Sequence, residues 1–295
     1  MHDSENMMVL AIDGGGTRCR LAASSNGVDH IVEVGSANVS TDFDGSVAVI
    51  RHGLSQLSLK AGQPVDDLFA LPAFIGLAGV TGPEMEQRLR NALPFLNAKI
   101  SDDRPAALRG ALGARDGVVA HCGTGSFYAS QVKDRMTFAG GWGYVLGDEA
   151  SAQWIGRQAL RCALETTDGR QPKTEFSQYV FDTYEDAAGI VRFANMARPS
   201  EFGQIAKGVT SFAADGDPLA QSIMKLGAQD IVRSLPKLGW SHGQAICLTG
   251  GIGPHYKDYL PIDMQTAVID PLGAPLDGAL DLARLLAKEP AHERG

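Results

Sequence analysis

The stretch MVLAIDGGGT, from Met8 to Thr17, joins an apolar run to a glycine-rich turn. A short apolar run that ends in a polar turn is typical of a buried β-strand. After the turn the chain returns as a second strand-like run, Cys19 to Ser24, and a third follows from Ile31 to Val34. This order predicts a strand, a glycine hairpin and two further strands at the start of a sheet.

The same pattern starts again in the second half of the chain. Val118 to Ala120 predicts a strand, Gly123-Thr124-Gly125 a turn, Ser126 to Val132 a returning strand and Met136 to Ala139 a third strand. Further short strands are expected at 74–77, 99–100 and 245–248. Helical spacing of apolar residues predicts helices at 45–59, 83–93, 149–164, 187–196, 202–212, 218–238 and 276–287. The repeat predicts an α/β protein with two similar halves, each built on a mixed sheet, and a cleft between them.

The expected domain boundaries follow from this repeat. Residues 1–107 should form an N-terminal lobe, joined by a C-terminal helix at 276–290, and residues 108–275 a C-terminal lobe. The hinge is expected near Arg104 to Leu112. For Pro218 to Leu238, the preceding Asp217 is the expected N-cap.

Composition limits the classes of partner. The net charge of −8 and a pI near 5.3 argue against nucleic acid or an anionic membrane, because no excess of cations could neutralise phosphates. No apolar run approaches the roughly 20 residues of a membrane span, and the run at Met7 to Ile12 is too short for a signal peptide. We therefore expect a cytoplasmic protein. The four cysteines lie far apart, so neither structural zinc nor a disulfide framework is expected.

Glycine is unusually frequent, at 35 of 295 residues, and it is clustered in turns. The first turn could surround phosphate oxygens with backbone N–H groups, and the second turn repeats its combination of small residues and hydroxyls. A third cluster, Thr249 to Gly253, would let a flat adenosine lie against the backbone. The residues expected to bind nucleotide are Asp13, Gly14, Gly15, Gly16, Thr17, Gly123, Thr124, Gly125, Ser126, Gly250, Gly251 and Gly253.

Each turn also has a simpler interpretation. Asp13 is expected to face Mg²⁺, a cation that needs only one or two protein oxygens, but a tight turn with an exposed aspartate is about equally consistent with one such turn alone. The third cluster could be an ordinary strand-to-helix turn. Neither a Gly-Lys dipeptide nor a G-x-G-x-x-G pattern occurs, which excludes a Walker A loop and leaves a Rossmann site unsupported.

The order of these motifs resembles that of the N-acetylglucosamine kinase branch of the BadF/BadG/BcrA/BcrD ATPase family, over essentially the whole chain. The most specific element is the stretch GGWGYVLGDE from Gly140 to Glu149, continuing to Gly156. The resemblance implies a duplicated ribonuclease H-like (actin-like ATPase) fold, two lobes with five-stranded mixed sheets, and an active site in the interlobe cleft. It also implies ATP with Mg²⁺, a sugar acceptor and a homodimer.

Phosphoryl transfer to a hydroxyl needs a carboxylate that accepts the hydroxyl proton. Relatives carry an aspartate before an Ala-rich helix, and counting back from Gly110 assigns Asp103 as the catalytic base and a contact of the acceptor. Its simpler interpretation is a helix N-cap, and Asp102 is the alternative base. Arg104 and Pro105 depart from the small residues of the family pattern.

The acceptor contacts come from the same resemblance. Asn38 would bind the hydroxyls of a sugar and Gly79 would line the pocket. Without the resemblance, a surface turn is the better explanation of Asn38, and a strand end is the simpler explanation of Gly79. The carboxylate of Asp148 would accept hydrogen bonds from the sugar, because a buried acceptor rejects analogues that lack the paired hydroxyl. The full set expected to bind substrate is Asn38, Gly79, Asp103, Thr124, Gly140, Gly141 and Asp148.

The predicted activity is ATP-dependent transfer of the γ-phosphate to the 6-hydroxyl of an amino sugar such as N-acetylglucosamine or glucosamine. Those sugars differ in one substituent, so the pattern leaves the acceptor open. Two alternatives also stay open. One is an ATPase that activates a radical dehydratase through an iron–sulfur cluster, for which no suitable cysteine pair is evident; the other is a non-catalytic sugar sensor, for which no helix-turn-helix pattern is evident.

Overall fold

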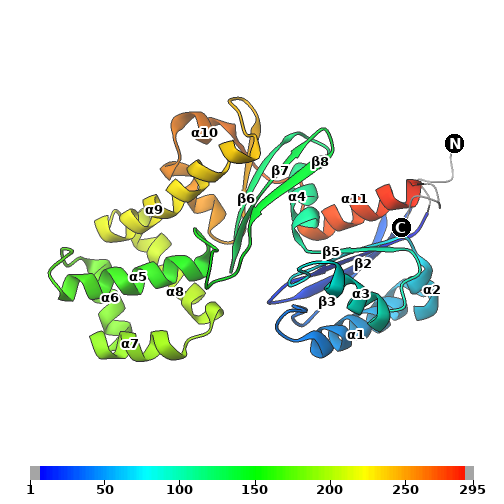
Figure 1. Ribbon diagram of the computed structural model, residues 1–295, viewed down its shortest axis with the longest axis horizontal. Helices are drawn as coiled ribbons and strands as arrows, with labels where there is room; N and C mark the ends of the chain where they lie inside the picture. Colours follow the sequence, from blue (N-terminus) through cyan, green and yellow to red (C-terminus); the bar gives the residue numbers. More distant parts are fainter. Residues whose placement is uncertain (1–6, 290–295) are drawn as a thin grey trace. The chain divides into compact units, whose positions relative to one another are not determined.

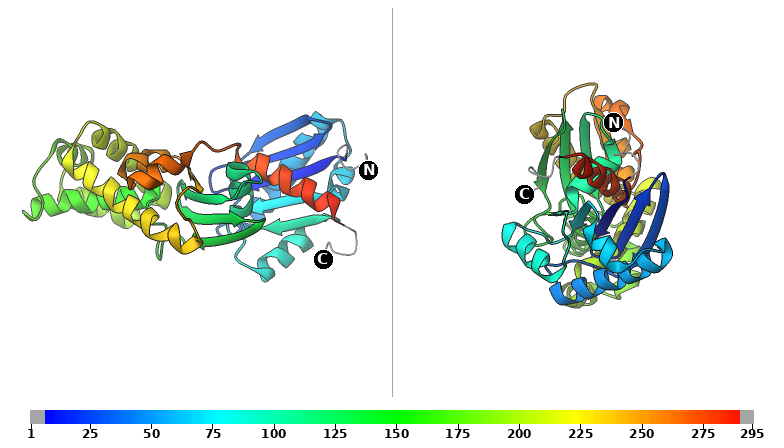
Figure 2. Two further views of the ribbon diagram at one scale, coloured as in Figure 1. Left: turned by 90° about the horizontal axis from the view of Figure 1, so that it is seen from above. Right: turned by 90° about the vertical axis from the view of Figure 1, so that its right-hand side faces the viewer.

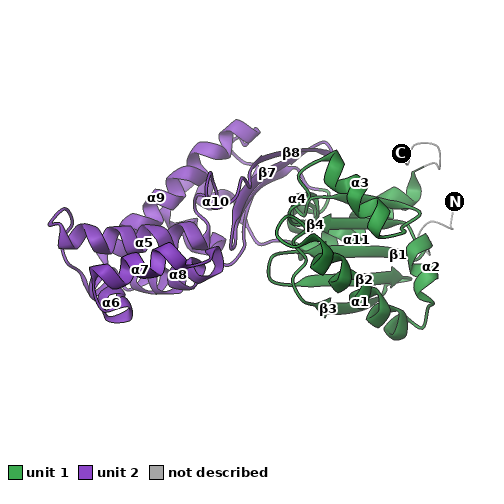
Figure 3. Cartoon of the chain, turned by 60° about the horizontal axis from the view of Figure 1, so that its bottom comes forward, with its two compact units in different colours: residues 1–114, 272–295 green, residues 115–271 purple. Residues whose placement is uncertain are grey.

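The computed structural model describes residues 7–289 of the chain. These residues form two compact units, coloured separately in Figure 3. Within the described residues, unit 1 combines residues 7–114 with 272–289, and unit 2 comprises residues 115–271. The boundaries expected from the sequence fall inside two helices of unit 1, α4 (Arg104–Leu112) and α11 (Pro275–Lys288).

Unit 1 is built on a five-stranded mixed sheet of order β3-β2-β1-β4-β5. Its strands are β1 (Val9–Gly14), β2 (Cys19–Ser25), β3 (Val28–Val34), β4 (Ala73–Leu77) and β5 (Ala98–Ser101). The remaining helices of the unit are α1 (Phe43–Ala61), α2 (Val65–Ala70) and α3 (Pro83–Ala92). β1 pairs antiparallel with β2 and parallel with β4, and β4 pairs parallel with β5.

Successive side chains of β1 point to opposite faces of this sheet, and a helix covers each face. Leu10 and Ile12 pack into one core with residues of α1, whereas Val9 and Ala11 pack into another with residues of α11. The two helices can be followed on either side of the sheet in Figures 1 and 2. Because both faces are covered, the strand reads as a continuous apolar run rather than as alternating polar and apolar residues.

Unit 2 repeats the plan, with the order β10-β9-β6-β7-β8. Its strands are β6 (Gly117–Cys122), β7 (Ser126–Val132), β8 (Arg135–Gly140), β9 (Ala245–Thr249) and β10 (Val268–Ile269). Its α-helices are α5 (Ala152–Thr167), α6 (Glu175–Tyr184), α7 (Ala187–Met196), α8 (Pro199–Ala214), α9 (Pro218–Ser234) and α10 (Ile262–Ala267), with short 3₁₀ helices η1 (Pro236–Leu238) and η2 (Gly253–Tyr259).

The pairing pattern is the same in both sheets. In each, the first three strands form an antiparallel meander, and the fourth strand pairs parallel with the first. The fifth strand then pairs parallel with the fourth. The duplicated α/β architecture predicted from the two glycine hairpins is therefore confirmed.

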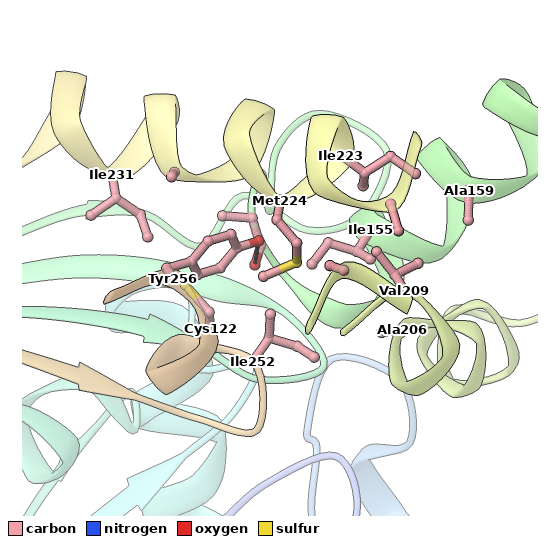
Figure 4. Close-up of a cluster of buried hydrophobic side chains, with 14 of the residues drawn as sticks. Cys122, Ile155, Ala159, Ala206, Val209, Ile223, Met224, Ile231, Ile252 and Tyr256 are labelled. Carbon is pink, nitrogen blue, oxygen red and sulfur yellow. Dashed lines mark hydrogen bonds between the residues drawn. The ribbon is translucent and has the colours of Figure 1, made fainter. Parts of the chain in front are cut away.

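The core of unit 2 joins the helices to the first strand of its sheet. Figure 4 shows Ile155 of α5, Val209 of α8 and Met224 of α9 pointing toward one another, with Tyr256 and Cys122 beside them. The Tyr256 hydroxyl donates to the carbonyl of Ala150 at 2.8 Å, which satisfies its buried polar group. Cys122 is fully buried in this cluster, as a small hydrophobic residue would be.

Several predicted helix ends differ from the observed ones for local reasons. The helix expected from residue 149 begins at Ala152, because Asp148 and Ala150 have left-handed backbone angles that no helix accommodates. The helix expected to reach residue 238 stops at Ser234, and the 3₁₀ turn after it begins with Pro236. Its N-cap is Asp217, as predicted; the side chain accepts from the N–H groups of Leu219 and Ala220. Within residues 7–289, no helix has the length and apolar character needed to cross a bilayer.

Candidate functional site

In unit 1 the candidate residues gather where three parallel strands end. The register aligns Asp13 of β1 with Gly76 of β4, and Gly76 with Ser101 of β5. Asp102 and Asp103 follow directly after β5 and lead into α4. The carboxyl edge of a parallel sheet is where open α/β folds bind ligands, and here that edge carries three carboxylates.

Asp103 stands at the N-cap position of α4, but its side chain makes no capping hydrogen bond. The simpler interpretation of this residue as a helix cap therefore lacks its defining contact. Burial of the carboxylate, reinforced by the negative charges of Asp102 and Asp13, raises the pKa of Asp103 from 3.8 to about 6. A carboxylate with a pKa close to neutrality is suited to accept a proton at physiological pH.

Asp102, the alternative base, is engaged by its neighbour. Its Oδ1 accepts from the backbone N–H of Arg104 at 3.0 Å and from the Nε of the same residue at 2.8 Å. Its Oδ2 accepts from Nη2 of Arg104 at 3.0 Å. Arg104, which departs from the family pattern, thus holds Asp102 in a bidentate ion pair. Of the two adjacent aspartates, Asp103 is the one outside this pair.

Asp13 also has a cationic partner, which the sequence reasoning missed. Arg20 faces it across the β1–β2 hairpin, and its Nη2 lies 2.5 Å from Oδ2 of Asp13. Both side chains are mostly buried, at 19% and 13% exposure. The Nε of Arg20 is buried and makes no hydrogen bond within residues 7–289. The sequence contained a signal for this ion pair: in an antiparallel hairpin that pairs Gly14 with Cys19, Asp13 must pair with Arg20.

The tip of this hairpin presents open backbone. Its turn is closed by a hydrogen bond from the N–H of Gly15 to the carbonyl of Arg18 at 2.9 Å. Gly16 and Thr17 are exposed at the tip, and the space beside the Cα of Gly16 is empty. Gly14 is required for packing, because a Cβ there would meet the side chain of Leu77.

Asn38 and Gly79 meet on the same side of unit 1. Asn38 forms a β-bridge with Ala78, and its Oδ1 accepts from the backbone N–H and the hydroxyl of Ser40 at 3.1 and 2.8 Å. A Cβ on Gly79 would lie 2.6 Å from that Oδ1, and Gly79 has a φ of +89°. The side-chain oxygen of Asn38 is thus occupied by Ser40, which leaves the side-chain NH₂ group as the donor for a ligand.

In unit 2 the second and third glycine clusters are in contact. The N–H of Ile252 donates to the carbonyl of Cys122 at 2.9 Å. Gly250 has a φ of +79°, and a Cβ there would clash with the backbone of Cys122 and lie 2.6 Å from the nitrogen of Gly123. Only glycine fits this position. The structure therefore joins Gly123–Ser126 and Thr249–Gly253 into one surface at the carboxyl ends of β6 and β9.

His121 lies beside this surface as a neutral side chain. Its Nδ1 is hydrogen-bonded to the hydroxyl of Thr249 at 3.1 Å, and its ring stacks on Phe127 at 4.9 Å. Burial lowers the pKa of His121 to about 4. No sequence pattern distinguished this histidine, because its partner lies on a strand far along the chain.

Asp148 connects the glycine turn to the loop at 140–150. The backbone N–H groups of Ser126 and Gly143 donate to its carboxylate, as does Nε2 of Gln153, at 2.9 Å from Oδ2. A Cβ on Gly125 would lie 2.8 Å from the same oxygen. Burial raises the pKa of Asp148 while these hydrogen bonds oppose the rise. The carboxylate thus holds the 123–126 turn, accepts three hydrogen bonds in all and has room for about one more.

Gln153 is a second polar group that sequence reasoning missed. It is 2% exposed, and its Oε1 is buried without a hydrogen-bond partner in the described chain. Nearby, Gly140 and Gly141 both have a φ of +75°, at the end of β8. The segment from Gly140 to Ala150 therefore concentrates left-handed backbone, which is characteristic of ligand-binding segments.

A cavity opens beside the third glycine cluster. It has a volume of about 590 Å³ and lies between the end of β9, η2 and the end of β10. Its lining includes Thr249, Gly250, Lys257 and Asp270. This volume lies within the range of small-molecule sites, which is about 300 to 1,000 Å³. Each unit thus holds its own set of predicted residues, and no group of three or more His, Cys, Asp or Glu side chains within residues 7–289 could enclose a metal.

Two repeats of a meander followed by parallel strands define the actin-like ATPase fold. A ROK family glucokinase from Streptomyces griseus, solved with glucose and AMPPNP, shares the fold at a TM-score of 0.55 and 17% identity, over 94% of this chain and 99% of that chain. The structure of a candidate N-acetylglucosamine kinase from Chromobacterium violaceum matches at a TM-score of 0.82 and 28% identity, over 96% of this chain and 100% of that chain.

The family follows from the sequence comparison. The model of the BadF/BadG/BcrA/BcrD ATPase family matches residues 10–268, and the chain belongs to this family. Among its relatives, the glucosamine kinase GspK of Vibrio cholerae serotype O1 is 28% identical over 287 residues, which is 96% of each chain.

Proposed function

We propose that this protein is an ATP-dependent sugar kinase that transfers the γ-phosphate of ATP to the 6-hydroxyl of an amino sugar. The observation that carries the proposal is the state of Asp103, a carboxylate without a capping bond and with a pKa near 6 at the carboxyl edge of a parallel sheet. The similarity to a glucosamine kinase and to a candidate N-acetylglucosamine kinase supports an amino sugar as the acceptor.

Asp103 acts as the general base in this proposal. It accepts the proton of the attacking hydroxyl as the oxygen bonds to the γ-phosphorus and the bond to the β-phosphate oxygen breaks. Protonated Asp103 then returns the proton to solvent. The negative charge of Asp102 helps to hold the pKa of Asp103 above its usual range, and the positive charge of Arg104 offsets part of that rise.

The nucleotide is assigned to the glycine clusters. The exposed backbone at Gly16 and Thr17 would donate to phosphate oxygens. In the turn at Gly123–Ser126 the donors would be the N–H groups of Thr124 and Gly125, because those of Gly123 and Ser126 already bond within the unit. The cavity beside Gly250 has the size for the adenosine. Lys257 at its wall supplies a donor or positive charge, and Asp270 an acceptor.

Mg²⁺ fits the residues of unit 1 as a companion of the phosphates. It keeps several waters and takes one or two carboxylates, which matches Asp13 rather than an all-protein cage. One oxygen of Asp13 is held by Arg20, so the other oxygen is the one available to the ion. When bound, Mg²⁺ offsets the charge that develops on the phosphates.

The acceptor is assigned to the groups around Asp103 and the loop at 140–150. The amide of Asn38 and the backbone beside Gly79 would bind hydroxyls in unit 1. In unit 2, the unpartnered Oε1 of Gln153 is an acceptor for a hydroxyl or amine, and Asp148 has room for one more hydrogen bond. Thr124, Gly140 and Gly141 complete the proposed set.

The cysteines argue against the iron–sulfur alternative. Three of the four are buried, and burial raises the pKa of Cys19 to about 12 and that of Cys247 to about 11. Thiolate ligands are therefore disfavoured at these positions. The homodimer and the cytoplasmic location stay predictions from the sequence.

A coupled assay of ADP release across hexoses and hexosamines tests the proposal. We expect ATP turnover to depend on an amino sugar and to be absent with its 6-deoxy analogue, because that analogue lacks the attacking hydroxyl. Product analysis by ³¹P NMR should show a phosphate monoester at C6. Sugar-independent ATP hydrolysis at the same rate would contradict the proposal.

A further inference from the structure

The helical layer of unit 2 contains a second cavity. None of its lining residues belongs to a glycine cluster or lines the first cavity. It has a volume of about 320 Å³ and lies among α5, α7 and α8, which run beside one another in Figure 3. Its floor is apolar, formed by Leu160, Ile190 and Phe202, each less than 10% exposed. The mouth includes the exposed residues Val191 and Asn195.

Arg157 and Arg161 of α5 bring positive charge to this apolar cavity. The Nε of Arg157 is buried and has no hydrogen-bond partner within residues 7–289. A buried donor without a partner costs about 1 to 3 kcal/mol, so such a group in a native fold calls for an explanation.

Arg157 differs in this respect from the other arginines of the helical layer. The five others between residues 152 and 234 all have a carboxylate within ion-pair distance: Arg161, Arg170, Arg192, Arg198 and Arg233. No ion pair to Arg157 is found in the described part of the chain. The one arginine of this layer without an ion pair among the described residues thus lies in the wall of the cavity.

Close helix packing holds Arg157 in place. The preceding residue, Gly156, lies at the contact of α5 with α8, where a Cβ would clash with the carbonyl of Phe202. On the side of α5 opposite Arg157, Ile155 and Ala159 point into the core in Figure 4 and fix the helix there. Arg157 is therefore positioned by a rigid helix pair rather than by an exposed loop.

We infer that this cavity binds a small amphipathic anion, with its acidic group on Arg157 and its apolar chain on Leu160, Ile190 and Phe202. The ligand class follows from the lining. An apolar floor favours a hydrocarbon or aromatic chain, whereas an unpaired guanidinium favours a carboxylate or another planar oxyanion. The side-chain amide of Asn195 at the mouth can donate a further hydrogen bond.

Calorimetric titration of the whole chain with butanoate, hexanoate and octanoate tests the site. We expect one saturable site per chain, with affinity rising about fourfold for each added methylene group that is buried. Octanol should bind at least about tenfold more weakly than octanoate, because it lacks the charge-assisted hydrogen bonds to Arg157.

Two variants and a matched control make the test specific. Arg157→Gln should weaken octanoate binding at least about tenfold, whereas Arg161→Gln, on the same helix but already paired with Glu165, should change it less than about twofold. Ala194→Trp, at the exposed mouth, should block the cavity without altering Arg157.

The inference fails if octanoate shows no saturable binding, or if it binds Arg157→Gln as well as the parent. On α5, Oε1 of Gln153, four residues before Arg157, is a buried acceptor that also lacks a partner. If Arg157 served only that group, Arg157→Gln would lower the melting temperature while leaving octanoate binding and its chain-length dependence unchanged. Should Arg157→Gln fold poorly, loss of binding in Ala194→Trp still supports the site, and retained binding there refutes it.

Discussion

The two sheets of this protein have the same strand order but opposite chemistry at their carboxyl ends. In unit 1, β1 carries Asp13 and β5 is followed by Asp102 and Asp103; Asp13 and Asp102 are paired with arginines. In unit 2, the ends of β6 and β9 carry glycines, threonines and the neutral His121, and the short strand β10 is followed by Asp270. The comparison teaches that one scaffold can supply a charged edge for proton transfer and a glycine-rich edge for close backbone approach.

The largest expected effect tests the charged edge. Asp103→Asn should lower kcat by about 10²- to 10⁴-fold, because the amide cannot accept the hydroxyl proton. The matched control is Asp102→Asn, which should lose less than about tenfold, since Asp102 is already bound to Arg104. Steady-state kinetics with ATP and the preferred sugar measure both. A larger loss in Asp102→Asn would reverse the assignment.

The next effect tests the glycine-rich edge of unit 2. Gly250→Ala should destabilise unit 2 by at least about 2 kcal/mol, because the position combines left-handed backbone with a clash against Cys122. It should also raise the KM for ATP. Gly251→Ala is the control, since nothing lies within 4 Å of the position of its Cβ. Equal melting temperatures for the two variants would show that the close approach at Gly250 is unimportant.

A third prediction concerns how Asp103 affects the stability of unit 1 as the pH changes. The native pKa of Asp103, about 6, lies above its unfolded value of 3.8, so the native state binds more protons between these values and loses stability as the pH rises through them. Asp103→Asn removes this penalty. We expect it to stabilise unit 1 at pH 7 by on the order of 3 kcal/mol, and to give no gain below pH 4.

That stability change can be followed by denaturant titration with hydrogen exchange of peptides from β1. An inactive variant that is more stable than the parent at neutral pH is expected of a carboxylate retained for function. Destabilisation by Asp103→Asn at pH 7 would instead indicate a structural role.

The smallest expected effect has the opposite sign and belongs to unit 2. The native pKa of His121, about 4, lies below its unfolded value of 6.5, so the unfolded state binds more protons in this window and stability falls as the pH drops through it. At pH 5.5 the loss should be on the order of 1 kcal/mol. His121→Asn, which retains a donor toward Thr249, should abolish that loss of stability, as measured by hydrogen exchange of peptides from β6. An unchanged pH dependence of the exchange would contradict the assignment of His121 as neutral.

Much of the fold could be predicted because its signals are local. The apolar runs of β1 and β6, the glycine turns after them and the cap at Asp217 depend on neighbouring residues. The elements that were missed, α2, α6, α10 and β10, are short or lack a long apolar stripe. Their formation depends on packing against distant parts of the chain.

The site was less predictable, because its electrostatics are set by tertiary contacts. Motif order could indicate Asp103, but its distinction from Asp102 depends on the conformation of Arg104. The use of Asp148 as an anchor for Ser126 and Gly143, and the contact of His121 with Thr249, join residues from separate segments. Which carboxylates are already engaged is therefore visible in the structure and not in the order of residues.

The return of the chain to unit 1 through α11 has a consequence for its synthesis. Leu276, Leu280 and Ala283 cover one face of the first sheet, and Gly278 packs closely on Ala106 and Gly110 of the helix that follows Asp103. A nascent chain on the ribosome can complete unit 2 while this face of unit 1 still lacks its cover. The half that was translated first is thus the half that finishes folding last, and the helix that supports the proposed base acquires its partner only when residues near 280 have emerged.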